Sequence, residues 1–126
     1  MNTAKDWATM SRCNRRKVGS ALVRDNRIVA TGFNGTPKGF DNECEDKDGK
    51  THWYTLHSES NCLMYAASKG INTEGATLYI TLSPCKECCK LIIQAGVVEV
   101  VYDEEYRDPS GIEFLKRNKI SVRRLI

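Results

Sequence analysis

The amino-acid sequence predicts a three-layer α/β/α fold built on a mixed five-stranded sheet. In the second half of the chain, short β-branched runs alternate with helical patterns, which is typical of parallel strands joined by helical crossovers. Near the start, Asp25-Asn26 separates two strand-like runs and therefore indicates an antiparallel hairpin. A sheet that contains both kinds of pairing buries its two faces under helices.

The first half of the chain is expected to open with a helix, because Ala4, Trp7 and Ala8 recur at helical spacing. A hairpin follows, and then a segment rich in Gly, Asn and Asp. Connections of more than about 12–15 residues are usually functional or disordered. In order, the expected elements are a helix over 2–11, strands over 18–23 and 27–31, and a loop over 32–56.

The second half begins with a helix that starts at or just after His57, and Gly70 ends it. Ser83 is the expected N-cap and Pro84 the first residue of the next helix, which Gly96 ends. The expected elements are a helix over 57–69, a strand over 76–81, a helix over 84–95, a strand over 97–102, a helix over 109–118 and a strand over 120–125.

The 126 residues are expected to form one domain, 1–126. A net charge of +3 suits an anionic small molecule and is too weak to indicate a nucleic acid. There is no apolar run of about 20 residues, so a membrane partner is not expected either. A cytoplasmic location is expected, and the six cysteines are read as thiols and metal ligands rather than as a disulfide framework.

His57-Ser58-Glu59 and Pro84-Cys85-Lys86-Glu87-Cys88 together form the pattern H-x-E followed by P-C-x-x-C, the signature of zinc-dependent nucleobase deaminases. A catalytic zinc has three protein ligands and keeps one position for water, and here His57, Cys85 and Cys88 supply three. Such a zinc lowers the pKa of its water to roughly 7.

Glu59 is the expected general acid/base, because hydrolysis of a ring C–NH2 group needs protons to leave water and to reach the ring and the amine. Each half of the signature has a plainer alternative when it stands alone. A C-x-x-C pair can be a redox pair or half of a structural zinc site, and the H-x-E pattern alone is so short that it often occurs by chance. A zinc-stabilised binding module without catalysis is a further alternative.

Two longer segments narrow the family. Arg16-Lys17-Val18-Gly19 leads into the first strand, and Thr31-Gly32-Phe33-Asn34-Gly35-Thr36-Pro37-Lys38-Gly39 is similar to G-[YF]-N-G-x-P-x-G. With His57-Ser58-Glu59-Ser60-Asn61, in which Ser58 replaces the usual Ala, these segments resemble the deoxycytidylate (dCMP) deaminases, most closely the phage type. The resemblance covers nearly the whole chain and implies the cytidine-deaminase-like version of the predicted fold.

The resemblance implies a function and partners. It implies hydrolysis of dCMP to dUMP and ammonia, which supplies the thymidylate precursor, and a homohexamer activated by dCTP and inhibited by dTTP, with Mg bound to the effector triphosphate. A phage-encoded enzyme would act in the host cytoplasm. The same chemistry on another substrate, such as dCTP, cytidine or a base in a nucleic acid, remains the alternative. A deaminase that acts on nucleic acid would be expected to have a more basic surface and exposed aromatic side chains that stack on the bases.

The resemblance also assigns further site residues. Asn34 would hold the deoxyribose hydroxyl, although it could equally be a left-handed turn residue. The resemblance adds Ser83, Tyr106 and Arg107 to the substrate site, the last two near the phosphate, whereas Tyr102 is as easily a core residue. An exposed Arg is ordinarily a solvated surface group, which is the plainer alternative for Arg107.

Two further groups are assigned by resemblance. An allosteric nucleotide site would use Arg15, Lys17, Gly35 and Asn42, against the alternative of a solvated basic face. A second, structural zinc would use Cys13, Cys44 and His52, although a closed site needs four ligands and no clear fourth is present. The alternative there is two buried thiols, and Cys62 and Cys89 are expected to be small core residues.

Overall fold

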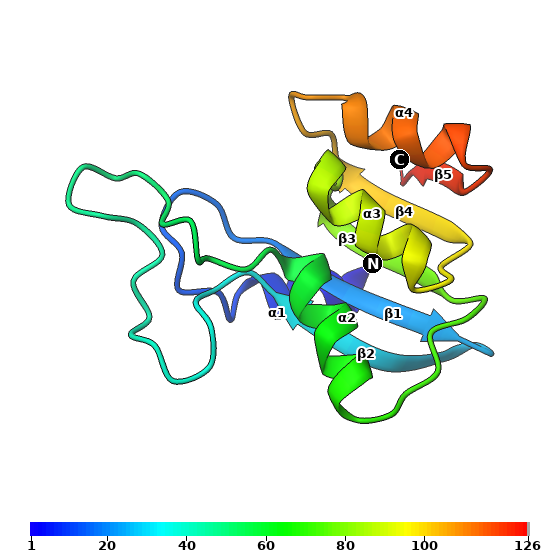
Figure 1. The fold of residues 1–126 in the computed structure, drawn as a ribbon, viewed down its shortest axis with the longest axis horizontal. Coiled ribbons are helices and arrows are strands. Elements are labelled where there is room, and N and C mark those ends of the chain that lie inside the picture. Colours follow the sequence, from blue (N-terminus) through cyan, green and yellow to red (C-terminus); the bar gives the residue numbers. More distant parts are fainter. Residues whose placement is uncertain (126) are drawn as a thin grey trace.

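The structure, a computed structural model, describes residues 1–125 (Figure 1). Every expected helix and strand is present, and no boundary moves by more than three residues. The elements are α1 (Asn2–Ala8), β1 (Gly19–Arg24), β2 (Arg27–Phe33), α2 (Ser58–Ser68), β3 (Thr77–Leu82), α3 (Lys86–Gln94), β4 (Glu99–Glu104), α4 (Ser110–Arg117) and β5 (Ser121–Arg124).

The five strands form one mixed sheet in the order β2-β1-β3-β4-β5, which confirms the predicted architecture. Strand β1 pairs antiparallel with β2 and with β3, whereas β3, β4 and β5 are parallel. Asp25 and Asn26, both with positive φ, make the tight turn between β1 and β2. Two positive φ values are typical of a type I′ turn, whose twist matches that of the flanking strands.

Helices α2, α3 and α4 lie together on one face of the sheet, and α1 covers the other (Figure 1). The three helices connect β2 to β3, β3 to β4 and β4 to β5, so the chain advances across the sheet in one direction. Crossovers between parallel strands have a fixed hand, and repeated crossovers in one direction therefore put their helices on the same face. This topology brings the first residues of α2 and α3 side by side.

The hydrophobic core lies between the sheet and these three helices. Its fully buried members include Leu22, Leu78, Ile80, Ile92 and Leu115. Cys62 and Cys89 are 0% exposed within this core, as predicted. Tyr102 is also buried, and its hydroxyl donates to Glu105 at 3.1 Å.

Two expected helix boundaries are wrong. Helix α1 ends at Ala8 rather than at Ser11, because the Ser11 hydroxyl bonds the carbonyl of Asn34 and draws the chain away. Helix α3 begins at Lys86 with Cys85 as its N-cap, rather than at Pro84. The Ser83 hydroxyl does not cap this helix, since it accepts a hydrogen bond from the backbone N–H of Tyr106 at 2.7 Å.

The loop between β2 and α2 projects from the body of the molecule (Figure 1). Its two ends are joined by paired backbone hydrogen bonds between Gly35 and Leu56, at 3.0 and 2.7 Å. A second isolated bridge joins Glu45 to Thr51 further out. None of the described helices is both long and apolar enough to cross a membrane.

Helix α2 approaches β2 at Gly32, where a side chain would not fit. A Cβ atom at this position would lie 2.5 Å from the carbonyl oxygen of Ser58 and 2.6 Å from the backbone nitrogen of Cys62. Both are backbone atoms of α2, so the helix itself would have to shift. Gly32 therefore fixes the depth at which the start of α2 lies on the sheet.

Gly32→Ala is expected to lower the free energy of unfolding by about 1–3 kcal/mol, as overpacking usually does. Gly35→Ala is the matched control, because a Cβ at Gly35 meets nothing within 4 Å. Urea denaturation of both variants measures the difference. Equal midpoints for the two variants would contradict the close contact.

Candidate metal centre and surrounding cavity

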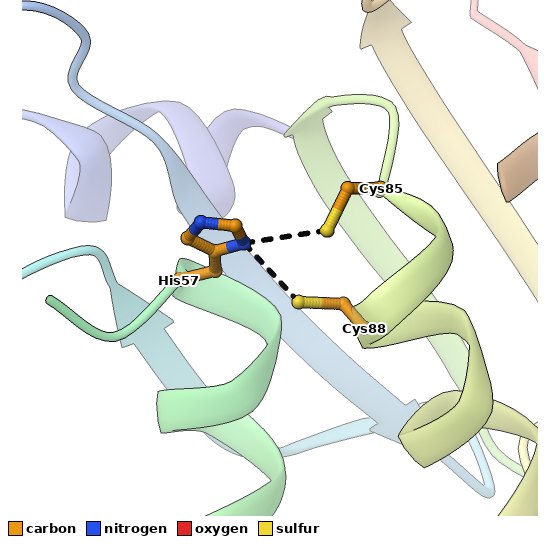
Figure 2. Close-up of side chains that lie close together, drawn as sticks. All are labelled: His57, Cys85 and Cys88. Carbon is orange, nitrogen blue, oxygen red and sulfur yellow. Dashed lines mark hydrogen bonds between the residues drawn. The ribbon is translucent and has the colours of Figure 1, made fainter. Parts of the chain in front are cut away.

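Three donor atoms from the starts of α2 and α3 converge on one point (Figure 2). His57 is the N-cap of α2 and Cys85 the N-cap of α3, while Cys88 lies in the first turn of α3. The His57 Nδ1 atom lies 3.3 Å from Cys88 Sγ and 3.5 Å from Cys85 Sγ. The extended backbone of His57 aims its ring at the sulfurs from just outside the helix.

These distances fit a zinc ion. Zinc–nitrogen bonds of about 2.0 Å and zinc–sulfur bonds of about 2.3 Å in a tetrahedron separate nitrogen from sulfur by about 3.5 Å. All three ligand atoms lie within 4.8 Å of one another. One nitrogen and two sulfurs are ligands that zinc prefers, and a set of three leaves a fourth position open.

The hydrogen bonds within this group favour a thiolate at Cys85. Hydrogen bonds from Cys88 and His57 lower the pKa of Cys85 to about 4. The same contact with Cys85 raises the pKa of His57. The hydroxyl of Ser60 lies 3.4 Å from Cys88 Sγ and fixes that sulfur from the other side. The hydrogen bond with the Cys85 thiolate and burial raise the pKa of Cys88, so in the absence of metal the pair shares one proton, which a bound metal ion would displace.

Glu59 lies beside the three donors without belonging to their cluster. It is 4% exposed, and burial raises the pKa of its carboxyl group to about 7. A carboxyl group with a pKa near neutrality both accepts and donates protons readily. A divalent cation nearby would favour the ionised form and lower this pKa.

Ser58, between His57 and Glu59, joins the start of α2 to the sheet. Its buried hydroxyl donates to Ser20 Oγ at 2.7 Å and lies 3.1 Å from the carbonyl oxygen of Gly32. The Ser20 hydroxyl in turn donates to the carbonyl oxygen of Ser58 at 3.1 Å. The serine at this position is therefore fully bonded, and the peptide that carries both functional side chains is held on β1 and β2.

A cavity of about 640 Å³ opens next to the donors. Besides His57, Glu59 and Cys85, its lining includes three arginines, Arg15, Arg16 and Arg107, and two further glutamates, Glu45 and Glu105. The expected substrate residues Asn34, Ser83, Tyr106 and Arg107 all line this cavity. The arginines make it suited to a ligand with a compact negative charge.

Asn34 is not a left-handed turn residue, since it is absent from the described positions with positive φ. Its side-chain oxygen accepts a hydrogen bond from the Val18 N–H at 2.9 Å, and its amide donates to the Arg16 carbonyl at 2.8 Å. The side chain thus ties the segment before β1 to the end of β2. The second N–H of the amide remains available to a ligand.

Cys13 and Cys44 lie together, as the expected second zinc site requires, and their sulfurs are joined by a disulfide bond. A sulfur in a disulfide is not a thiolate, so the two cysteines would bind zinc only as the reduced pair. His52 is not brought to this pair, because its ring stacks on Tyr54 at 4.7 Å. The acidic group that accompanies the two sulfurs is Glu45.

The four expected allosteric residues line three cavities of the chain, and their role stays a prediction. Arg15 lines the cavity beside the metal ligands, and Lys17 lines a hollow near Asp103 and Glu104. Gly35 and Asn42 line a third cavity, of about 780 Å³, along β2 and the projecting loop.

Comparison with known proteins agrees with this site. Residues 1–104 match the family described as the cytidine and deoxycytidylate deaminase zinc-binding region. The fold and the site thus define a zinc-binding deaminase fold with a His/Cys/Cys centre. The chain belongs to the cytidine and deoxycytidylate deaminase family.

Similar proteins include deoxycytidylate deaminases. The enzyme of Saccharomyces cerevisiae is 38% identical over 98% of this chain and 42% of its own length. The ComE operon protein 2 of Bacillus subtilis is 38% identical over 91% of this chain and 63% of its own. The chain thus spans less than two thirds of both relatives. A crystal structure of dCMP deaminase from cyanophage S-TIM5 with dCMP and dUMP is 42% identical, has a TM-score of 0.96, and matches over 98% of this chain and 92% of that one.

Several cavity residues were not found by sequence reasoning. Glu45, Thr51, Thr55 and Glu105 line the cavity but belong to no motif, and Arg16 belongs to a family segment that gave it no role in the site. The only signal for Glu45 is its position next to Cys44, which was itself singled out as a ligand. The pairing of the loop with the segment before β1 depends on tertiary contacts.

Cys88→Ser is expected to lower the affinity for zinc by more than about 100-fold, because even the loss of a group that merely supports a ligand reaches this range. Cys89→Ser is the matched control, since Cys89 Sγ instead contacts the carbonyl oxygen of Gly111 at 3.3 Å. Zinc per chain after dialysis against a chelator measures the effect. Retention of zinc by Cys88→Ser would exclude it as a ligand.

Proposed function

We propose that the chain catalyses zinc-dependent hydrolysis of dCMP to dUMP and ammonia. The observation that supports this most directly is the buried Glu59 carboxyl next to the His57, Cys85 and Cys88 donors, in a cavity that arginines also line. The likeness to a dCMP deaminase whose crystal structure contains dCMP and dUMP supports the choice of substrate. Production of dUMP would supply the precursor of thymidylate.

His57, Cys85 and Cys88 would hold the zinc ion, which when bound supplies a water of lowered pKa. Glu59 accepts a proton from the water that attacks the amino-bearing carbon of the cytosine ring. It delivers this proton to the ring nitrogen, then takes the remaining proton from the added hydroxyl group and passes it to the departing amine, so water is consumed and ammonia released. Burial keeps Glu59 close to the reacting atoms and limits its exchange with solvent.

The rest of the cavity would recognise the nucleotide. Asn34 presents its free amide N–H to the deoxyribose hydroxyl, and Ser83 fixes the loop of Tyr106 through the 2.7 Å hydrogen bond to its N–H. Arg107 lies on that loop and pairs with the phosphate. This arrangement favours a monophosphate over a nucleoside, which has no charge for Arg107 to bind.

We infer the remaining partners from the family alone. They are a homohexamer, activation by dCTP with Mg, inhibition by dTTP and a cytoplasmic location, in the host if the chain is phage-encoded. The residues of the expected effector site, Arg15, Lys17, Gly35 and Asn42, line three cavities of the chain. A dCMP assay with and without dCTP and dTTP measures this regulation directly.

Glu59→Gln is expected to abolish ammonia release from dCMP, by at least about 100-fold, because an amide cannot transfer the protons. Zinc content should stay at the wild-type value, since Glu59 is outside the donor cluster. Glu113→Gln, on the exposed side of α4, is the matched control. A Glu59→Gln enzyme with full activity would remove Glu59 from the mechanism.

Arg107→Ala is expected to raise KM for dCMP by about tenfold and to leave KM for deoxycytidine unchanged, because only dCMP carries the phosphate. Arg117→Ala, exposed on α4, is the control for loss of charge. Ammonia release is measured with dCMP, dCTP, deoxycytidine and single-stranded DNA. If the enzyme preferred dCTP, deoxycytidine or single-stranded DNA, that compound would replace dCMP as the proposed substrate.

A further inference from the structure

Ser60 contacts a metal ligand that belongs to the neighbouring helix. It lies in the first turn of α2, and its hydroxyl oxygen is 3.4 Å from Cys88 Sγ in the first turn of α3. His57 Nδ1, also from the start of α2, is 3.3 Å from the same sulfur (Figure 2). Two residues of one helix therefore contact the Cys88 sulfur of the other.

The hydroxyl of a helical serine ordinarily bonds the backbone of its own helix. Ser68, at the end of α2, does so, because its hydroxyl donates to the carbonyl oxygen of Tyr65 at 2.8 Å. Within residues 1–125, the one hydrogen bond of the Ser60 hydroxyl joins it to Cys88 instead. The contact thus links the two helices that carry the metal ligands.

The neighbours of Ser60 in this turn have other partners. Ser58 is bonded to the sheet, and the Asn61 amide donates to the carbonyl oxygen of Phe33 at 2.7 Å. Ser58 and Asn61 therefore fix α2 on the strands, whereas Ser60 reaches towards α3. The position of Cys88 relative to α2 depends on a different side chain from the position of α2 on the sheet.

Burial gives this contact its chemical importance. Cys88 is 4% exposed, whereas Cys85 is only partly buried. A metal ligand must be a thiolate, and a thiolate that water hardly reaches needs a hydrogen-bond donor from the protein. A thiolate has no proton to donate, so with a metal bound the Ser60 hydroxyl is the donor and the sulfur the acceptor.

Metal binding would also change the second contact to this sulfur. The His57 nitrogen that faces Cys88 is the atom that would bind the ion, so it could no longer bond the sulfur directly. The Ser60 hydroxyl is not one of the three metal donors, and its hydrogen bond can persist in both states. It is therefore a link between α2 and Cys88 that does not depend on the ion.

We propose that Ser60 is a positioning residue of the metal centre, which donates a hydrogen bond to the Cys88 thiolate and holds this sulfur at its zinc-binding position. The inference rests on the zinc site of the proposed function and not on the identity of the substrate. Ser60 is outside the lining of the catalytic cavity, so its effect is on metal binding rather than on nucleotide binding. Loss of such an outer partner typically costs about 10–100-fold in metal affinity.

The first test measures zinc affinity without turnover. The protein is stripped of metal and titrated with zinc against a competing chelator. Ser60→Ala is expected to raise the dissociation constant for zinc by about tenfold or more. Ser68→Ala is the matched control on the same helix, because its hydroxyl bonds α2 itself, and its dissociation constant should change by less than about twofold.

An isosteric pair at the same position separates the hydroxyl from the shape of the side chain. Ser60→Thr keeps the hydroxyl, whereas Ser60→Val has nearly the same shape without it. We expect Ser60→Thr to bind zinc to within about threefold of the wild type and Ser60→Val to bind it as weakly as Ser60→Ala. Thermal unfolding checks that each variant is folded, and the isosteric pair decides the question if Ser60→Ala is not.

Cobalt(II) in place of zinc gives a spectroscopic signature of the hydrogen bond. Electron transfer from thiolate sulfur to cobalt produces an absorption band, and a hydrogen bond to the sulfur raises its energy. The band is expected to shift to longer wavelength in Ser60→Ala and Ser60→Val, and to stay in place in Ser60→Thr and Ser68→Ala. A residue that only stabilised the fold would not move this band.

Several results would overturn the inference. These are an unchanged dissociation constant for zinc in Ser60→Ala, equal losses in Ser60→Thr and Ser60→Val, and a cobalt band that does not move. A rise of more than about twofold in KM for dCMP in zinc-saturated Ser60→Ala would also overturn it, by placing Ser60 in the nucleotide site. Failure of the zinc-loaded wild type to release ammonia would remove only the proposed function.

Discussion

The close contact of helix α2 with strands β1 and β2 is the constraint on which the site depends. Gly32 lets the helix backbone reach the sheet, and the hydroxyls of Ser20 and Ser58 bind it there. His57 and Glu59 flank Ser58, so their positions follow from this contact. Helix α3 brings its cysteines to the same point because its crossover lies on the same face. A shift of one helix by a fraction of the zinc–ligand distance would separate the three donors.

The charges of the cavity are balanced rather than uniformly positive. Its lining includes three arginines and three glutamates, of which only Glu59 is buried next to the metal donors. Glu45 accepts hydrogen bonds from backbone N–H groups at the rim, and the Arg16 side chain is ion-paired with Glu104. Glu59, the proposed proton-transferring group, is thus separate from the charged groups at the rim. Because opposite charges line one cavity, its selectivity comes from geometry more than from net field.

Much of the fold and of the metal site could be predicted from the sequence. Alternating strand and helix patterns, the Asp25-Asn26 turn, and glycines after helices are local signals, and the H-x-E and P-C-x-x-C spacing is a local constraint on ligands. The start of α3 was missed because Ser83 bonds Tyr106, a partner distant in sequence. Glu45 and the Cys13–Cys44 bond were also missed, because both depend on contacts that a long loop makes with a segment distant in sequence.

The metal-binding residues and the rest of the cavity wall come from different kinds of backbone. The metal-binding group and Glu59, from His57 to Cys88, belong to one nearly contiguous stretch of two helices and a central strand. The wall that faces the rest of a ligand comes from loops: residues 13–16, the projecting loop, and residues 105–107. Helices and strands packed on a core tolerate little change, whereas surface loops accept substitutions and insertions. The preference for one ligand over another can therefore be altered piece by piece while the reaction itself is preserved.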